Sequence, residues 1–217
     1  GACATSVTSI KYAILEKQSF TIVKTLTTMP SAVVANSLMD ACALTGGGFA
    51  IVFQASAFPL QSQLTTYDNA GNVVITPTTI WTRTGTSSVQ YHRMGQLSDD
   101  NLIVAVRSTN TGGSVGIFHG IVTTAAVSVL PFTNLDSSSG YSSPCQLSVM
   151  DGYYAIALAN SVSNVYRAMV FSNSGTLQGS EFTTAAMSNT SPHQKLVNDG
   201  HFFYYIWAQV SNLKEML

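Results

Sequence analysis

The chain has 217 residues, of which only 9% are charged, and its formal net charge is −1. An ordinary soluble domain carries about 25% charged residues; here Ser, Thr, Asn and Gly take their place. The sequence lacks the basic runs that make phosphate contacts in nucleic-acid-binding proteins, and it has no apolar run near the ~20 residues of a membrane-spanning helix. We therefore expect neither nucleic acid as a main partner nor insertion into a membrane.

The chain opens with GACATSVTSIKY, which has neither an initial Met nor a charged-then-apolar signal. Such a start is typical of a processed protein or of a piece excised from a longer polypeptide. The first predicted element is a β-hairpin over residues 10–26, with Lys17 and Gln18 in its turn. This turn signal is weak because neither residue is Gly or Asn.

Four later segments share one pattern: a short semi-apolar piece, a turn of Gly, Asp or Asn, and then an apolar run. The pattern recurs about every 50 residues. In chain order the segments read ACALTGGGFAIVFQAS, MGQLSDDNLIVAVRST, CQLSVMDGYYAIALAN and HQKLVNDGHFFYYIWAQ. Each predicts an inner strand, a tight turn and a second strand. Because the runs are apolar on consecutive residues, we expect both faces of every second strand to be buried.

Hairpin signatures keep the same period between these segments. They are LTTYDNAGNVVITP, GIVTTAAVSV and AMVFSNSGTLQGSE, with turn residues between apolar alternations. Each unit therefore has four strands, which is typical of a β-propeller. We predict a single all-β domain over residues 1–217, a β-propeller of about four four-stranded blades. Its parts are a half blade at 10–36, blades at 37–88, 89–139 and 140–190, and a half blade at 191–217.

The two half blades leave two architectures open. If the N-terminal and C-terminal hairpins pair, the chain closes into a ring of four blades without an exposed sheet edge. In the alternative architecture, the chain is a slice of a longer propeller.

The acidic residues give a weak catalytic signal. Asp99, Asp151 and Asp199 fall on repeat-equivalent turns and Asp68 on a hairpin turn, where Asp is favoured because it binds local backbone. Asp40 and Asp136 are expected to precede inner strands, so they are the candidates for an axial acid pair of the kind that glycosidases use. No sialidase-type Ser-x-Asp-x-Gly-x-x-Trp box is present.

Histidine and cysteine indicate no metal or cofactor. His92 and His193 both lie near the start of an inner strand and could face the same axial channel. Two imidazoles without a third ligand make a poor metal site, so structural polar roles are the better account of both. The three cysteines lack metal or CxxC spacing, and Cys42 and Cys145 read as small buried apolar residues. The sequence also lacks the GxSxG, HExxH and P-loop motifs.

Three aromatic residues near predicted loops are the candidates for ligand binding: Phe58, Trp81 and Tyr141. Such side chains serve as sugar-stacking platforms or interface anchors. The structural alternative is that they cover the ends of blades.

The run GGGFAIVFQ at 46–54, followed by YDNAGN at 67–72, carries a resemblance. It is similar to the degenerate repeats of large bacterial secreted and surface proteins, and to related propeller segments of bacteriophage tail fibres. The resemblance covers about residues 37 to 209. It implies an extracellular or virion-associated repeat module, and it transfers no catalytic residue.

These observations lead to three hypotheses for function. The first is a non-enzymatic structural or adhesive propeller in an extracellular or virion assembly, with other chains and a cell-surface glycan as partners. The second is a glycan-processing enzyme with an axial pocket around Asp40, Asp136 or a histidine. The third is a free-standing lectin.

Overall fold

The computed structural model describes residues 7–16, 19, 21–34, 39–55, 61–82, 91–109, 115–123, 133–136, 145–160, 163–185 and 190–209. This part of the chain is all-β, with strands that pair antiparallel and without any helix. It accordingly contains no helix that could cross a membrane.

The first sheet has six strands: β1 (Val7–Leu15), β2 (Ile22–Val34), β3 (Asp40–Ala43), β4 (Phe49–Ala55), β5 (Gln61–Tyr67) and β6 (Val73–Thr82). Strands β3 to β6 form an up-and-down meander in which each strand pairs with the next. The N-terminal hairpin, β1–β2, joins this meander through a single residue pair, Val33 with Ala55. It is therefore an appendage to a four-stranded unit.

Two further four-stranded meanders follow. The second sheet contains β7 (Tyr91–Gln96), β8 (Asn101–Thr109), β9 (Val115–Thr123) and β10 (Thr133–Asp136). The third contains β11 (Gln146–Met150), β12 (Tyr153–Asn160), β13 (Val165–Ser172) and β14 (Phe182–Thr183). The chain continues with a C-terminal hairpin of β15 (Thr190–Asn198) and β16 (Phe203–Gln209), which pair only with each other among the described strands.

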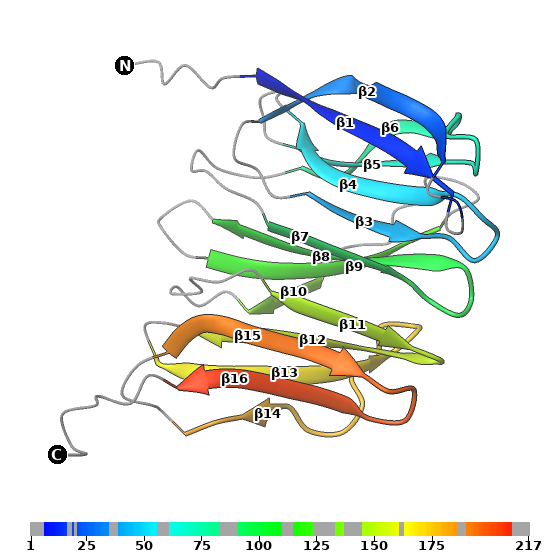
Figure 1. Ribbon diagram of the computed structural model, residues 1–217. Helices are drawn as coiled ribbons and strands as arrows, with labels where there is room; N and C mark the ends of the chain where they lie inside the picture. The colour runs from blue at the N-terminus through cyan, green and yellow to red at the C-terminus, as the bar shows by residue number, and fades with distance from the viewer. Residues whose placement is uncertain are drawn as a thin grey trace, which may run out of the picture.

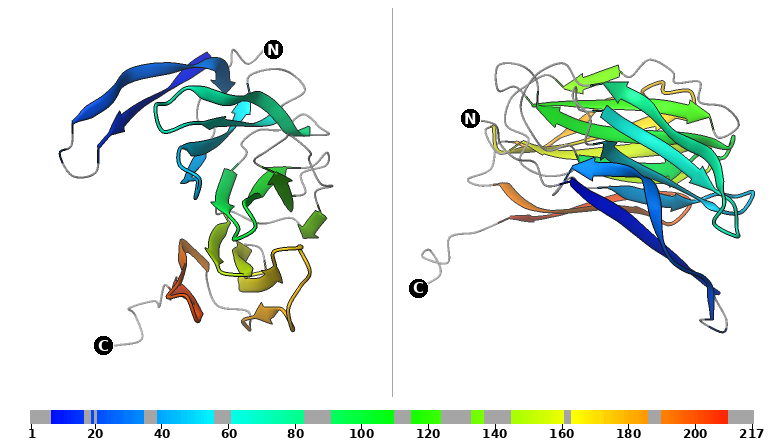
Figure 2. Two further views of the ribbon diagram at one scale, coloured as in Figure 1. Left: turned by 90° about the vertical axis from the view of Figure 1, so that its right-hand side faces the viewer. Right: turned by 90° about the horizontal axis from the view of Figure 1, so that it is seen from above.

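The sheets stack on one another in chain order, and the two chain ends lie at opposite ends of the stack (Figure 1). Seen from the side, the stack curves into an open arc (Figure 2). The first strands of the successive units, β3, β7, β11 and β15, lie side by side and are called the inner strands below. The described N-terminal and C-terminal hairpins do not pair, so this structure does not show a closed ring.

Apolar side chains fill the space between neighbouring sheets. The second strands are the most deeply buried: from Leu102 to Val106, every residue of β8 is 0% exposed. Between the first and second sheets, Val52 of β4 packs against Met94 and Val104. Ile103 of the second sheet packs in the same way with Ile156 of the third. Burial on both faces explains why these strands are apolar on consecutive residues.

The turns between inner and second strands have the chemistry that the sequence predicts. Gly48, Gly152 and Gly200 have φ between 75° and 90°, which glycine adopts without a steric penalty. At Gly48 the requirement is also spatial, because a Cβ there would lie 2.0 Å from the carbonyl oxygen of Tyr67.

The N-terminal hairpin packs on the outer face of the first sheet. The Tyr12 ring meets Phe49 and Tyr67 at centroid distances of 5.4 and 4.9 Å. Ile10 and Met29 lie in the same apolar cluster. This cluster fixes the hairpin more firmly than its single backbone contact with β4.

Candidate functional site

Asp40 is the one carboxylate on the described inner strands. It stands at the first position of β3, half-buried, and its Oδ2 accepts a 2.8 Å hydrogen bond from the backbone N–H of Met94 on β7. Because β7 is the next inner strand, this bond ties two sheets together along their inner edges. The predicted position of Asp40, close to the start of an inner strand, agrees with the structure.

Cys42 lies two residues after Asp40 on the same face of β3. Burial, and secondarily the negative charge of Asp40, raise the pKa of its thiol to about 12. Cys145, fully buried between the second and third sheets, also has its pKa raised to about 12, chiefly by burial. Both thiols are free and stay protonated at neutral pH, so neither supplies a nucleophilic thiolate.

Asp136 does not join Asp40. The structure places it at the end of β10, the outermost strand of the second sheet. Strand β10 is three strands away from the inner strand β7, or roughly 14 Å at ordinary strand spacing. The expectation that Asp136 precedes an inner strand at the axis is therefore wrong.

The acids in turns have structural partners. Asp68 accepts hydrogen bonds from Asn72, which lower the pKa of its carboxyl. Asp99 accepts from the backbone N–H and the side chain of Asn101. Asp199 accepts from the Tyr204 hydroxyl and from two backbone N–H groups, and these bonds lower its pKa. These carboxylates close turns, as the sequence indicates.

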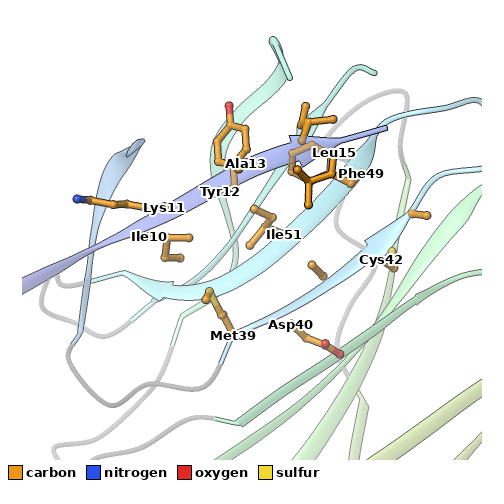
Figure 3. Close-up of a pocket in the computed structure, with 13 residues that line it drawn as sticks. Ile10, Lys11, Tyr12, Ala13, Leu15, Met39, Asp40, Cys42, Phe49 and Ile51 are labelled. Carbon is orange, nitrogen blue, oxygen red and sulfur yellow. The ribbon is translucent and has the colours of Figure 1, made fainter. Parts of the chain in front are cut away.

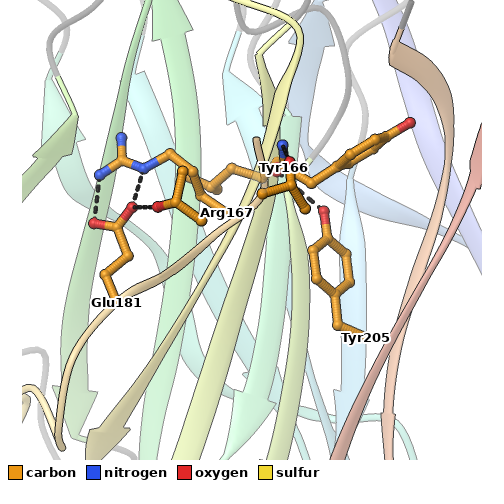
Figure 4. A network of polar contacts seen from close by, with 7 residues as sticks. Tyr166, Arg167, Glu181 and Tyr205 are labelled. Atoms are coloured by element: carbon orange, nitrogen blue, oxygen red, sulfur yellow. Dashed lines mark hydrogen bonds and ion pairs between the residues drawn. The ribbon is translucent and has the colours of Figure 1, made fainter. Parts of the chain in front are cut away.

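Glu181 is paired on the outer part of the third sheet. Its carboxylate accepts two hydrogen bonds from the Arg167 guanidinium, of which the one from Nη2 to Oε2 is 2.6 Å (Figure 4). The Arg167 hydrogen bonds hold the pKa of Glu181 below its ordinary value. This pair lies away from the inner strands and accounts for both residues structurally.

A buried polar group connects the first and second sheets. His92 Nε2 lies 2.9 Å from Ser62 Oγ, and both residues are 0% exposed. A serine beside an imidazole is the geometry of an activated nucleophile, but a substrate cannot reach a fully buried hydroxyl. His92 is thus a buried structural residue and does not face an open channel, as the preferred interpretation of the sequence has it, while the side chain of His193 lies outside what the structure describes.

Sequence reasoning did not find Gln54. This residue pairs across β4 and β5 with Ser62 and is 1% exposed, and neither polar atom of its amide has a hydrogen-bond partner within the described structure. The sequence feature that identifies Gln54 is a polar amide at the end of the apolar run FAIVFQ. A buried polar group without a partner is costly, so Gln54 lowers the stability of this end of the interface.

Of the three aromatic candidates, the structure describes only Trp81. It stands near the end of β6, half-buried, and packs against the apolar cluster between the first and second sheets. Phe58 and Tyr141 lie outside the described residues. Among the described His, Cys, Asp and Glu side chains, no three gather closely enough to hold a metal ion.

A cavity of about 660 Å³ lies between the N-terminal hairpin and the first sheet (Figure 3). Apolar groups dominate its walls: Ile10, Ala13 and Leu15 of β1, Ala41 and Ala43 of β3, and Phe49 and Ile51 of β4. Asp40 is at its margin, with one carboxylate oxygen bonded to β7 instead. Walls with so few hydrogen-bonding groups are poorly matched to the hydroxyls of a sugar.

No protein-family profile matches the chain, and no curated protein matches it. One matching solved structure is described as "Crystal structure of a thermostable family-43 glycoside hydrolase", with 7% sequence identity and a TM-score of 0.45. The match spans 78% of this chain and 64% of the hydrolase. By itself this likeness assigns no residue and no reaction to the chain.

This finding corrects the first functional hypothesis. That hypothesis, a non-enzymatic structural or adhesive module, is not retained, because the matching solved structure is described as a glycoside hydrolase. The resemblance to bacterial surface repeats and phage tail fibres has no support from the family comparison.

Proposed function

We propose that this chain is a β-propeller of about four blades that processes glycans, with the Asp40 carboxylate as its acid–base group. Support for the architecture comes from three four-stranded meanders that stack in chain order with their inner strands side by side. An extracellular setting, expected from the uncharged Ser- and Thr-rich composition, is part of the same proposal.

The observation that carries the proposal is the placement of Asp40. It is the described carboxylate that belongs to an inner strand and not to a turn or an outer strand. Its Oδ2 is held by the Met94 N–H, and within the described residues its Oδ1 accepts no hydrogen bond. A carboxylate oriented through one oxygen, with the other available, can exchange a proton with a bound substrate.

Four other acids are engaged in structural hydrogen bonds and are therefore less suited to acid–base chemistry. Asp68, Asp99 and Asp199 use their oxygens to close turns, and Glu181 uses its oxygens on Arg167. Substitution of Asp40 is therefore the change that tests whether the chain is an enzyme or only a glycan-binding protein.

The test is turnover on a panel of oligosaccharides and polysaccharides, measured as newly formed reducing or unsaturated ends. Asp40→Asn keeps a side-chain oxygen for the Met94 N–H while removing the titratable group. We expect it to lower turnover by a factor of about 10²–10⁴, the usual contribution of an acid–base group. Asp151→Asn, in an exposed turn, is the matched control and is expected to keep full activity.

Equal turnover in the wild type and Asp40→Asn would show that Asp40 is not the acid–base group. Glycan binding without turnover in the wild type would contradict an enzyme and favour the lectin alternative. Circular dichroism and thermal unfolding of both variants check that any loss of turnover is not a loss of folding.

A further inference from the structure

The two ends of the stack leave open parts of the surface that neighbouring sheets bury inside the stack. At each internal interface, the face of one sheet that points toward the C-terminal end meets the opposite face of the next sheet. Ile103 and Ala105 show this arrangement in the second sheet, where Tyr154 and Ile156 of the third cover them. At the N-terminal end the β1–β2 hairpin covers Ile51 and packs on Phe49, while at the C-terminal end no described sheet covers the outward face of β15–β16.

The exposed face of the C-terminal hairpin is mainly apolar, with the exposed Lys195 of β15 opposite Ile206. Val197 of β15 and Tyr204 and Ile206 of β16 are 37%, 45% and 58% exposed, and we call them the C-terminal face. Their neighbours along the strands, Leu196 and Tyr205, point the other way and pack on the third sheet. Strand β16 is thus a second strand with one covered face and one open face.

The opposite end of the stack presents the complementary surface. The N-terminal face consists of Ala41 and Ala43 of β3 with Phe49 and Ile51 of β4, and it forms one wall of the 660 Å³ cavity (Figure 3). Asp40 and Cys42 alternate with these alanines and belong to the face toward the second sheet. In the repeating pattern, the surface that meets a face of this kind comes from the inner and second strands of a neighbouring unit.

The unpaired strand edges also match a C-terminal hairpin to the N-terminal end of the stack. Within the described chain, β1 pairs only with β2, and β16 only with β15. Placing β16 beside β1 gives the order β15-β16-β1-β2, a four-stranded unit like the second and third sheets. An unpaired strand edge is a ready template for such pairing.

Each free edge lies beside a cavity. The 660 Å³ cavity is lined by β1 from Ile10 to Leu15, where β15–β16 would add the inner half of the unit. A second cavity, of about 340 Å³, is lined by Phe182 of the third sheet and by Tyr205 and Trp207 of β16. There the β1–β2 hairpin of a neighbouring unit would add the outer half of the four-stranded unit. A single contact between the two hairpins therefore fills both cavities.

We propose that the β15–β16 hairpin of a second copy of this chain docks into the cavity beside β1, with β16 pairing to β1 and the C-terminal face covering the N-terminal face. The occupant is a second copy because the chain's own hairpin lies at the opposite end of the stack (Figure 1). The contact is heterologous, with different surfaces on the two copies, so repeated contacts produce a closed ring or an open chain of copies.

A mixing experiment tests this proposal with two variants, each blocked at one face. The double variant Ala41→Glu with Ala43→Glu places charge on the N-terminal face, and Val197→Glu with Ile206→Glu places it on the C-terminal face. All four positions are exposed, so folding should persist, and circular dichroism checks this. Val74→Glu is the control, because Val74 is 63% exposed and lies on β6, a strand that contributes to neither face.

The readout is molar mass by size-exclusion chromatography with light scattering. We expect the wild type and Val74→Glu to run at a multiple of the 23.0 kDa monomer mass, and each double variant alone to run as a monomer. An equimolar mixture of the two double variants should run at twice the monomer mass, because each supplies the face that the other lacks.

A wild type that stays monomeric at the highest attainable concentration would overturn the proposal. Hydrogen exchange would then show whether β16 is protected in the monomer, as it would be if the chain's own hairpin filled the cavity. Double variants that assemble as well as the wild type would overturn it too, because assembly would then use other surfaces.

Discussion

Strands β8 and β16 occupy the same place in their units but differ in what surrounds them. Both are second strands with apolar runs, LIVAV in β8 and FYYIWA in β16. In β8 every residue from Leu102 to Val106 is 0% exposed, while Tyr204 and Ile206 of β16 remain open. Burial is thus a property of the stack and not of the strand, because a second strand is enclosed only when a unit lies on each side.

The largest expected effect comes from a matched pair of isoleucines in these strands. Ile103→Ala opens a cavity between the second and third sheets and should lower the free energy of unfolding by about 2–5 kcal/mol. Ile206→Ala, at a side chain 58% exposed, should change it by less than about 0.5 kcal/mol in the dilute monomer. Urea unfolding followed by circular dichroism measures both, and equal losses would contradict the distinction between interior and end.

A second pair compares glycines in the first and last turns of the stack. Gly48 and Gly200 both have φ near 90°, so Ala is strained at each, at a cost of about 1 kcal/mol or more. At Gly48 the added Cβ would also lie 2.0 Å from the Tyr67 carbonyl oxygen, while at Gly200 it meets nothing within 4 Å.

We therefore expect Gly48→Ala to cost about 3 kcal/mol and Gly200→Ala about 1 kcal/mol. Thermal unfolding of the two variants beside the wild type gives the ranking. Gly46→Ala, which has no Cβ neighbour within 4 Å and no positive φ, should unfold like the wild type. A larger loss at Gly200 than at Gly48 would show that the contact with the Tyr67 carbonyl oxygen does not add to the cost of Ala at Gly48.

The contrast between interior and ends also marks what the sequence could predict. Apolar runs that follow Gly, Asp or Asn predict the second strands and their turns because these signals are local. Pairing between residues 7–34 and 190–209 depends on long-range geometry, which no local pattern encodes. For this reason closure of the ring could be proposed from the sequence but not decided.

The candidate site shows the same limit. The sequence predicts Asp40 near an inner strand because Asp40 directly precedes the first repeat. For Asp136 the local pattern misleads, because TNLD has no apolar run that identifies it as an outer strand. Within the described chain, β10 pairs with β9 through three residue pairs. Burial of His92 against Ser62 and the isolation of Gln54 depend on how two sheets meet, and this is absent from the spacing of either segment.

The smallest expected effect concerns the ion pair between Glu181 and Arg167 on the outer part of the third sheet. Glu16, at the N-terminal end of the stack, serves as the comparison. Glu181 is half-buried against Arg167, whereas Glu16, beside the turn of the N-terminal hairpin, is exposed. Because Arg167 depresses the pKa of folded Glu181, the pair stabilises the fold above pH 4.5, the ordinary pKa of a glutamate. That contribution is lost as the pH falls through the lower folded value.

Glu181→Gln should therefore cost about 1 kcal/mol at pH 7 and progressively less below pH 4.5, because protonation already weakens the pair in the wild type. Glu16→Gln should leave the free energy of unfolding within about 0.5 kcal/mol of the wild type at neutral pH, since exposed charges contribute little. Urea titrations at pH 7 and at several values below 4.5 measure both. If the loss in Glu181→Gln grew on acidification, the carboxylate would not be the stabilising form, and the pairing with Arg167 would not explain the depressed pKa.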